Sequence, residues 1–182
     1  MDSEKGDNQA CWYAMRDLKR SNAKLPAYKL FQAKEIEVFT PMKWTVSTQK
    51  GKQVRKEIPV MPDLLFVHAS REVIDPIVRK TPTIQYRYAR GGGYLNPMTV
   101  NTKEMQRFIY AINGSHNQKY YLPEEITPEM CCRKIRVVGG VFDGYEGKLI
   151  TVRGSKVKRL LVELPGFLSV GVEVEPEMIE LI

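Results

Sequence analysis

The sequence predicts an α+β fold in two parts, an antiparallel sheet with flanking helices and a small β-barrel after it. Strand-like and helix-like segments alternate over residues 11–113, and polar, acidic and proline residues dominate residues 115–129. Only short β-rich runs separated by glycine turns follow from residue 134, a pattern typical of a small barrel. We therefore expect a disordered tail at 1–10, a first domain at 11–113, a linker at 114–130 and a barrel domain at 131–182.

The first domain opens with a strand over Cys11–Asp17, where aromatic and apolar residues are concentrated. A helix is expected mainly over Pro26–Lys34, because proline is tolerated at the first helical position but not inside a helix. The run IEVFTP predicts a second strand that ends at Pro41. The runs KWTVST and QVRKEIPV then flank a turn at 49–52, which predicts a β-hairpin.

The second half of this domain repeats the strand and helix pattern. The continuous apolar run Leu64–His68 predicts a buried strand. Residues 71–80 have a helical pattern that contains Pro76, so either Ser70 caps a kinked helix or Asp75 caps a short one. Another strand is expected from residue 84 to residue 89, before a glycine turn at 91–93.

The last helix of the domain has the clearest periodicity. Apolar residues recur at spacings of three and four: Met105, Phe108, Ile109 and Ile112. Asn101 or Thr102 can cap its start, and Asn113 with Gly114 can end it. Beyond the linker, the runs KIRVV, KLITV, RLLVEL and SVGVEV predict the strands of the barrel.

Composition restricts the functional classes. The net charge of +7 favours anionic partners, and residues 1–113 hold 19 Lys+Arg against 11 Asp+Glu, whereas residues 130–182 hold 8 against 7. No apolar run approaches the roughly 20 residues that cross a bilayer, and the first ten residues are polar, so we expect a cytoplasmic protein with no membrane partner. The three cysteines and two isolated histidines suggest free thiols, with no metal and no cofactor.

An enzyme is not expected. The glycine-rich run from Gly139 to Gly147 resembles a phosphate-binding loop only superficially, because a strand rather than a helix is predicted to follow it. No nucleophile with a base, metal-ligand cluster or isolated pair of carboxylates stands out in the sequence.

Two stretches together resemble one protein family. The run VVGGVFDGYEGKLITVRGSKVKRLLVEL resembles the KOW motif, and WYAMR combined with EIPVMPDLLFV resembles the N-terminal (NGN) domain of NusG. The details IEVFTPM, LLFVHASRE and ELPGFLSVGVEVEPEMIE are similar to the specialised UpxY-type paralogues. The resemblance implies a non-enzymatic elongation factor or antiterminator, monomeric, acting on a polysaccharide biosynthesis operon. The alternative is a KOW-containing RNA-binding or ribosome-associated protein.

The resemblance also implies a docking surface for the clamp helices in the largest subunit of RNA polymerase. The matching positions are Met61, Leu64, Phe66, Met105 and Phe108. Exposed apolar surface with flexible methionines suits a protruding helical tip. Phe66 and Phe108 have the alternative of being ordinary core residues. The loop at Asp75–Val78 departs from the polar, threonine-rich version in some paralogues, so a second polymerase contact there is not predicted.

Two basic clusters are candidates for nucleic acid. The resemblance places the first near the non-template DNA strand of the transcription bubble. Its candidate contact residues are Arg16, Lys19, Arg20 and Lys24, with Lys29 and Lys34 beside them. The second lies on the predicted hairpin and consists of Lys43, Lys50, Lys52, Arg55 and Lys56. Either cluster has the alternative of being a solvated basic face.

The predicted barrel has one candidate partner surface. Phe142 and Tyr145 occupy the turn that related proteins use to contact a ribosomal small-subunit protein or Rho. The alternative is that these aromatic residues cap the end of the barrel. Some relatives refold this domain into a helical hairpin, but the many glycines between β-branched strands favour a permanent barrel here.

Overall fold

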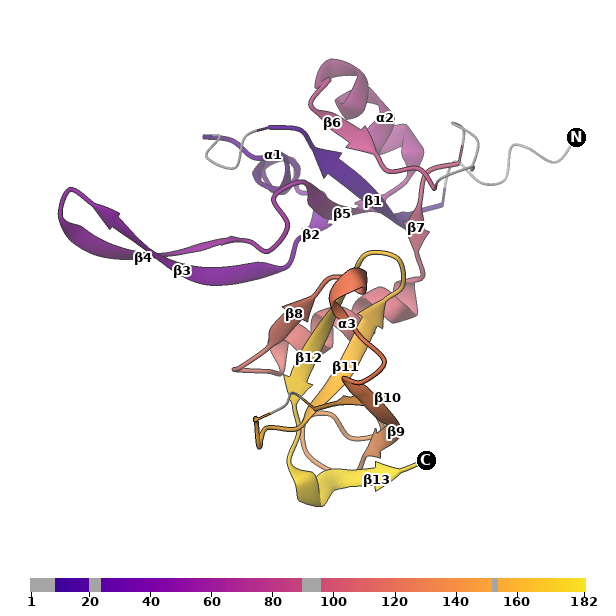
Figure 1. Cartoon of the computed structure of the whole chain (residues 1–182). Helices are drawn as coiled ribbons and strands as arrows, with labels where there is room; N and C mark the ends of the chain where they lie inside the picture. Colours follow the sequence, from indigo (N-terminus) through magenta and orange to yellow (C-terminus); the bar gives the residue numbers. More distant parts are fainter. Residues whose placement is uncertain (1–8, 20–23, 90–95, 152–153) are drawn as a thin grey trace, which may run out of the picture. The chain divides into compact units, whose positions relative to one another are not determined.

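The computed structural model describes residues 9–19, 24–89, 96–151 and 154–182. The chain divides into two compact units, Met1–Thr102 and Lys103–Ile182 (Figure 1). The N-terminal unit contains a five-stranded sheet, two helices and a long hairpin, and the C-terminal unit contains a helix and a six-stranded sheet.

The sheet of the N-terminal unit is antiparallel throughout, with the order β2-β5-β1-β6 and with β7 also paired to β1. Its strands are β1 (Cys11–Asp17), β2 (Glu37–Phe39), β5 (Leu64–Ala69), β6 (Ile84–Tyr86) and β7 (Thr99–Val100). The strand over Cys11–Asp17 is confirmed at both ends, and the antiparallel sheet is confirmed. Strand β6 is shorter than predicted, and the glycine turn after it lies outside the described residues.

Helices α1 (Ala27–Ala33) and α2 (Arg71–Lys80) pack on one face of this sheet. Phe31 of α1 and Ile74 of α2 are fully buried against strand residues that alternate along β1 and β5. Of the two alternatives for residues 71–80, the long helix that starts after Ser70 is correct, and it continues through Pro76. Ser70 makes no side-chain capping bond there. The opposite sheet face is also apolar, since Trp12, Leu64 and Phe66 are buried.

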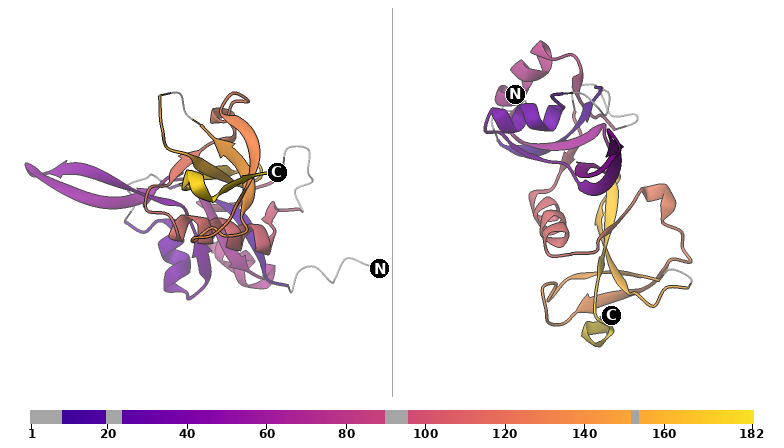
Figure 2. Two further views of the ribbon diagram at one scale, coloured as in Figure 1. Left: turned by 90° about the horizontal axis from the view of Figure 1, so that it is seen from below. Right: turned by 90° about the vertical axis from the view of Figure 1, so that its left-hand side faces the viewer.

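The predicted hairpin consists of β3 (Met42–Gln49) and β4 (Lys52–Pro59), paired over eight positions. Lys50 and Gly51 form its two-residue turn, both with positive φ (49° and 76°), as the turns that match strand twist require. The two strands form a sheet of their own and project as an arm from the N-terminal unit (Figures 1 and 2).

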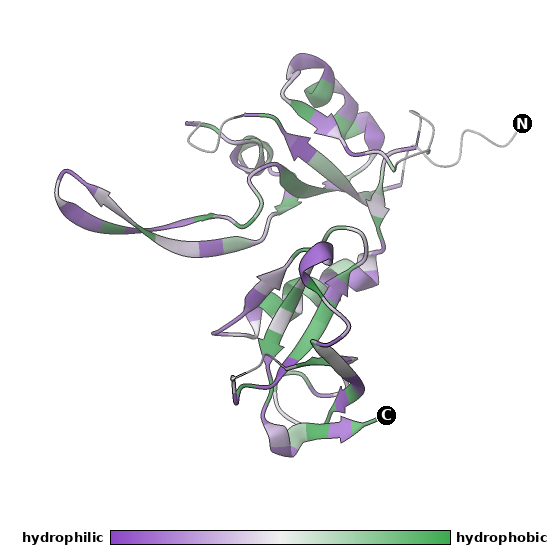
Figure 3. Ribbon diagram, viewed as in Figure 1, coloured by the Kyte–Doolittle hydropathy of each residue, from purple (hydrophilic) through white to green (hydrophobic). Residues whose placement is uncertain are grey.

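The C-terminal unit holds a six-stranded antiparallel sheet of order β13-β9-β10-β11-β12-β8. Its elements are α3 (Thr102–Asn113), β8 (Lys119–Tyr121), a 3-10 turn at Pro123–Glu125, β9 (Cys131–Val137), β10 (Glu146–Ile150), β11 (Arg159–Leu164), β12 (Leu168–Glu173), a 3-10 turn at Pro176–Met178 and β13 (Ile179–Leu181). Strands β11 and β12 are hydrophobic along most of their length (Figure 3) and supply much of the buried core.

Two features of this unit differ from the domain organisation expected from the sequence. Strand β8 lies inside the segment expected to be a linker and pairs with β12, through contacts such as Val170 with Tyr120. Helix α3 groups with the C-terminal unit, whereas the sequence analysis places it at the end of the first domain. The domain boundaries proposed from the sequence remain a prediction.

Candidate functional site

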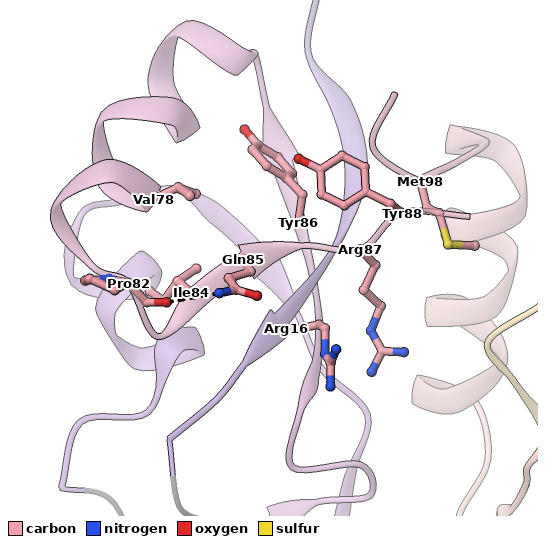
Figure 4. A pocket seen from close by; sticks show the side chains of 9 residues that line it. All are labelled: Arg16, Val78, Pro82, Ile84, Gln85, Tyr86, Arg87, Tyr88 and Met98. Carbon is pink, nitrogen blue, oxygen red and sulfur yellow. Dashed lines mark hydrogen bonds between the residues drawn. The ribbon is translucent and has the colours of Figure 1, made fainter. Parts of the chain in front are cut away.

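An open pocket of about 620 Å³ lies beside β6 in the N-terminal unit. Residues from β1, the end of α2, β6 and the segment after it line this pocket: Arg16, Val78, Pro82, Ile84, Gln85, Tyr86, Arg87, Tyr88 and Met98 (Figure 4). The two arginine side chains lie next to each other at one side of it. Arg16 on β1 pairs with Gln85 on β6, and side chains alternate between the two faces of each strand. Residues far apart in the sequence therefore lie together beside β6.

The two arginines share one carboxylate. The Arg87 guanidinium donates to Asp63 Oδ2 at 2.9 Å, and Arg16 Nη2 lies 3.9 Å from the same oxygen. Burial lowers the pKa of Arg87, and the neighbouring Asp63 carboxylate opposes that change, so Arg87 stays charged at neutral pH. Two guanidiniums against one carboxylate leave this edge of the sheet positive, which suits a phosphate group.

Tyr86 holds the other side of the pocket in place. Its hydroxyl donates to Asp75 Oδ1 at 2.7 Å, and Arg71 Nη2 lies 3.5 Å from the other oxygen of that carboxylate. Burial, together with the hydrogen bond to Asp75, raises the pKa of Tyr86 well above its ordinary range. Tyr86 is therefore a neutral structural residue that fixes α2 to β6.

The first basic cluster surrounds the connection from β1 to α1. Arg16 and Lys19 lie at its start and Lys24 near its end, whereas Arg20 lies outside the described residues. Asp17 is the acid within this cluster, and it is buried. Its two oxygens accept hydrogen bonds from the backbone N–H groups of Lys19 (3.0 Å) and Ala27 (2.6 Å). Asp17 therefore fixes the start of α1, a role that its position in the sequence did not indicate.

The five apolar residues assigned to polymerase docking occupy different environments. Met61 lies half-buried before β5, whereas Leu64 and Phe66 on β5 are buried. On α3, Met105 and Phe108 are also fully buried. Of the five, only Met61 retains exposed side-chain surface, and the other four have the burial of core residues.

The two aromatic residues of the β9–β10 turn pack within the C-terminal unit. Phe142 is buried, and Tyr145 lies 5.8 Å from it between ring centroids. Tyr145 also stacks on Tyr110 of α3 at 6.0 Å, lies under the Arg107 guanidinium at 4.8 Å and donates to the Arg107 carbonyl at 3.2 Å. Arg107 in turn bonds the carbonyl of Glu146. These contacts join α3 to the turn.

Sequence reasoning did not single out Arg87 or Asp63. Each is a single charged residue among apolar and polar neighbours. Neither belongs to a charge cluster or to a recognisable motif that would mark it as functional. Only the pairing of Arg16 with the strand that precedes Arg87 brings the three charges together. The described residues contain no group of three or more His, Cys, Asp and Glu side chains that could hold a metal ion.

A comparison with known protein families gives a match over the N-terminal part of the chain. Residues 10–109, more than half of the chain, match the family described as transcription termination factor nusG. The match begins at β1 and ends within α3, so it includes the arginine-lined pocket, the hairpin and Met61. A comparison with curated proteins finds no match. In the described part of the chain, no helix is long and apolar enough to span a membrane.

Proposed function

Because this chain belongs to the NusG family of transcription factors, we propose that it binds RNA polymerase through its N-terminal unit and promotes read-through of pauses or terminators. The observation that carries the proposal is the family match, which covers almost the whole of that unit. The similarity to UpxY-type paralogues supports a finer proposal, that the target is a polysaccharide biosynthesis operon. In vitro transcription on the leader of the protein's own operon tests this: read-through should rise when the protein is added.

We assign the polymerase contact to the clamp helices of the largest subunit. Met61 is the accessible anchor, and Leu64 and Phe66 support it from the same strand region. The resemblance also assigns Met105 and Phe108 to this contact, and both are fully buried residues of α3 in the C-terminal unit. Because interface energy concentrates in a few anchors, Met61→Asp should cost about 2 kcal/mol of polymerase affinity.

A matched variant controls for the added charge. Val73→Asp places the same acid at an exposed apolar position of α2, which is 46% exposed. We expect Val73→Asp to retain polymerase binding. If folded Met61→Asp binds core polymerase as tightly as the unchanged protein, Met61 is not part of the contact.

We assign the non-template DNA contact to the first basic cluster, Arg16, Lys19, Arg20 and Lys24. Arg16 belongs to this cluster and also lines the pocket together with Arg87. The phosphates of a DNA strand that passes here therefore have several cations within reach. Each neutralised phosphate releases counterions, so four contacts predict a log-log salt slope of roughly −3 on single strands.

We infer that the C-terminal unit is an SH3-like barrel of the KOW kind. Its strands pair in an order that winds from β13 through to β8, and Gly147 allows β10 to approach β11 closely. Phe142 and Tyr145 are the proposed contact for a ribosomal small-subunit protein or Rho. Because Tyr145 packs on α3, that partner has to share or displace the Tyr110 and Arg107 contacts.

The alternative function is a KOW protein that binds RNA or ribosomes through its C-terminal unit. That unit is nearly neutral, and several of its cations are already paired, including Arg136 with Glu146, Lys148 with Glu163 and Arg159 with Glu173. Retention of the chain by purified core polymerase without RNA supports the transcription factor. Retention only by RNA or ribosomes supports the alternative.

A further inference from the structure

The β3–β4 hairpin is built as a free-standing ribbon. Each strand has eight residues, which at about 3.4 Å per residue span roughly 27 Å. Neither strand pairs with a described strand outside the hairpin, so no neighbouring strand covers either edge of the ribbon. Most residues of both strands are exposed. Large apolar side chains that lie together on an exposed ribbon indicate an interaction site.

Trp44 and Val46 share one face of the hairpin, whereas Val54 pairs with Ser47 and lies on the other face. Trp44 is 59% exposed and Val46 is 62% exposed. Val46 pairs directly with Arg55, so the Arg55 side chain lies on the same face. Its guanidinium carbon lies 4.4 Å from the centre of the Trp44 ring. The face therefore presents an indole next to a planar cation.

The ribbon is strongly basic. Five exposed cations, Lys43, Lys50, Lys52, Arg55 and Lys56, oppose a single acid, Glu57. In the described structure, none of the five forms an ion pair. Glu57 lies opposite Trp44 near the base, so the positive potential is greatest from Val46 to the tip.

We propose that this hairpin binds single-stranded nucleic acid, with a base stacked at the Trp44–Arg55 pair and the adjoining phosphates held by Arg55 and by Lys50 at the turn. Lys43, Lys52 and Lys56 alternate onto the opposite face of the ribbon and add to its positive potential. Aromatic and arginine planes stack on any base, and lysines neutralise the backbone. A duplex fits less well, because its bases are already stacked on one another and leave no open face for the indole. The inference goes beyond the proposed function, since it requires neither polymerase nor the cluster at Arg16 and Lys19.

The two tryptophans give a direct readout in the full chain. Trp12 is 2% exposed and stacks on His68, whereas Trp44 is exposed. Titration with oligothymidylate or oligouridylate of about 12 nucleotides should quench the emission of Trp44. Anisotropy of the labelled oligonucleotide gives the affinity, and the two sugars show whether DNA or RNA is preferred. A duplex of the same length should bind more weakly and quench less.

Variants separate stacking from charge. Trp44→Ala should weaken binding about tenfold, Trp44→Phe should recover most of that loss, and Arg55→Lys should weaken binding although the charge is kept. Lys50→Gln should lower the steepness of the log-log salt dependence by about 0.7, whereas Lys80→Gln at the end of α2 should leave it unchanged. Circular dichroism checks that each variant is folded.

Three results would overturn the proposal. The first is equal affinity of Trp44→Ala and the unchanged protein for the single strand. The second is tighter binding of the duplex than of either single strand. The third is loss of Trp44 quenching in Lys19→Glu/Lys24→Glu, because that would place the strand on the other basic cluster. Polymerase binding by Trp44→Ala should be unchanged, so failure here leaves the proposed function standing.

Discussion

Replacing Asp17 by alanine should destabilise the N-terminal unit by roughly 3 kcal/mol. The Asp17 side chain is only 5% exposed, and each of its oxygens accepts one backbone N–H. The buried bond from Ala27 N at 2.6 Å should contribute about 2 kcal/mol and the partly buried bond from Lys19 N about 1 kcal/mol, because hydrogen bonds to charged groups are strong and unpaired buried donors are costly. Asp17→Asn keeps one acceptor oxygen, so it should lose about half as much.

Urea unfolding followed by tryptophan fluorescence is the suitable assay. Trp12 and Trp44 are the two tryptophans of the chain and both belong to the N-terminal unit, so the signal reports that unit alone. The alanine variant should also lower the melting temperature on the order of 15 °C. Its affinity for DNA should fall, because the bond to Ala27 N fixes the connection that holds Lys19 and Lys24.

A matched acid provides the control. Glu72 is exposed in the first turn of α2, and Glu72→Ala should change stability by less than about 1 kcal/mol. If Asp17→Ala is no more destabilising than Glu72→Ala, the two backbone bonds do not hold α1 in place, and the reasoning about this connection is wrong.

Two further predictions concern the two units separately. Burial and the bond to Asp75 raise the pKa of Tyr86, so its contribution to stability is complete below the unfolded value of about 10 and is lost as the pH rises above it. Tyr86→Phe should therefore show a shallower fall in stability above that pH, and identical fluorescence unfolding curves would contradict this. Gly147→Ala places a Cβ 2.6 Å from the Leu161 carbonyl oxygen and 2.8 Å from Leu160 Cδ1, which should destabilise the C-terminal unit by about 1–3 kcal/mol. Unchanged amide exchange in β10 and β11 would show that this close approach can relax at no cost.

The elements of the fold follow mostly from local pattern. Strand β1, helix α1 to within one residue at each end, the hairpin and helix α3 are confirmed, because alternation, helical spacing and turn residues act over a few neighbouring positions. The short strands β7, β8 and β13 were not predicted. Strand β8 has only three residues and exists through its pairing with β12, which lies about fifty residues further along the chain.

Local sequence also determined which residues are apolar or charged, and hence the basic N-terminal unit and the presence of a tryptophan among the cations of the hairpin. It did not determine which of them are accessible. The spacing of apolar residues in the sequence is the same for an apolar docking surface and for a buried core. Only the packing of the folded chain assigns four of the candidates to the interior: Leu64, Phe66, Met105 and Phe108. Asp17, Asp63 and Arg87 acquire their roles from partners across the sheet or along a connection. Burial and long-range pairing depend on segments far apart in the chain, so the tertiary structure alone decides them.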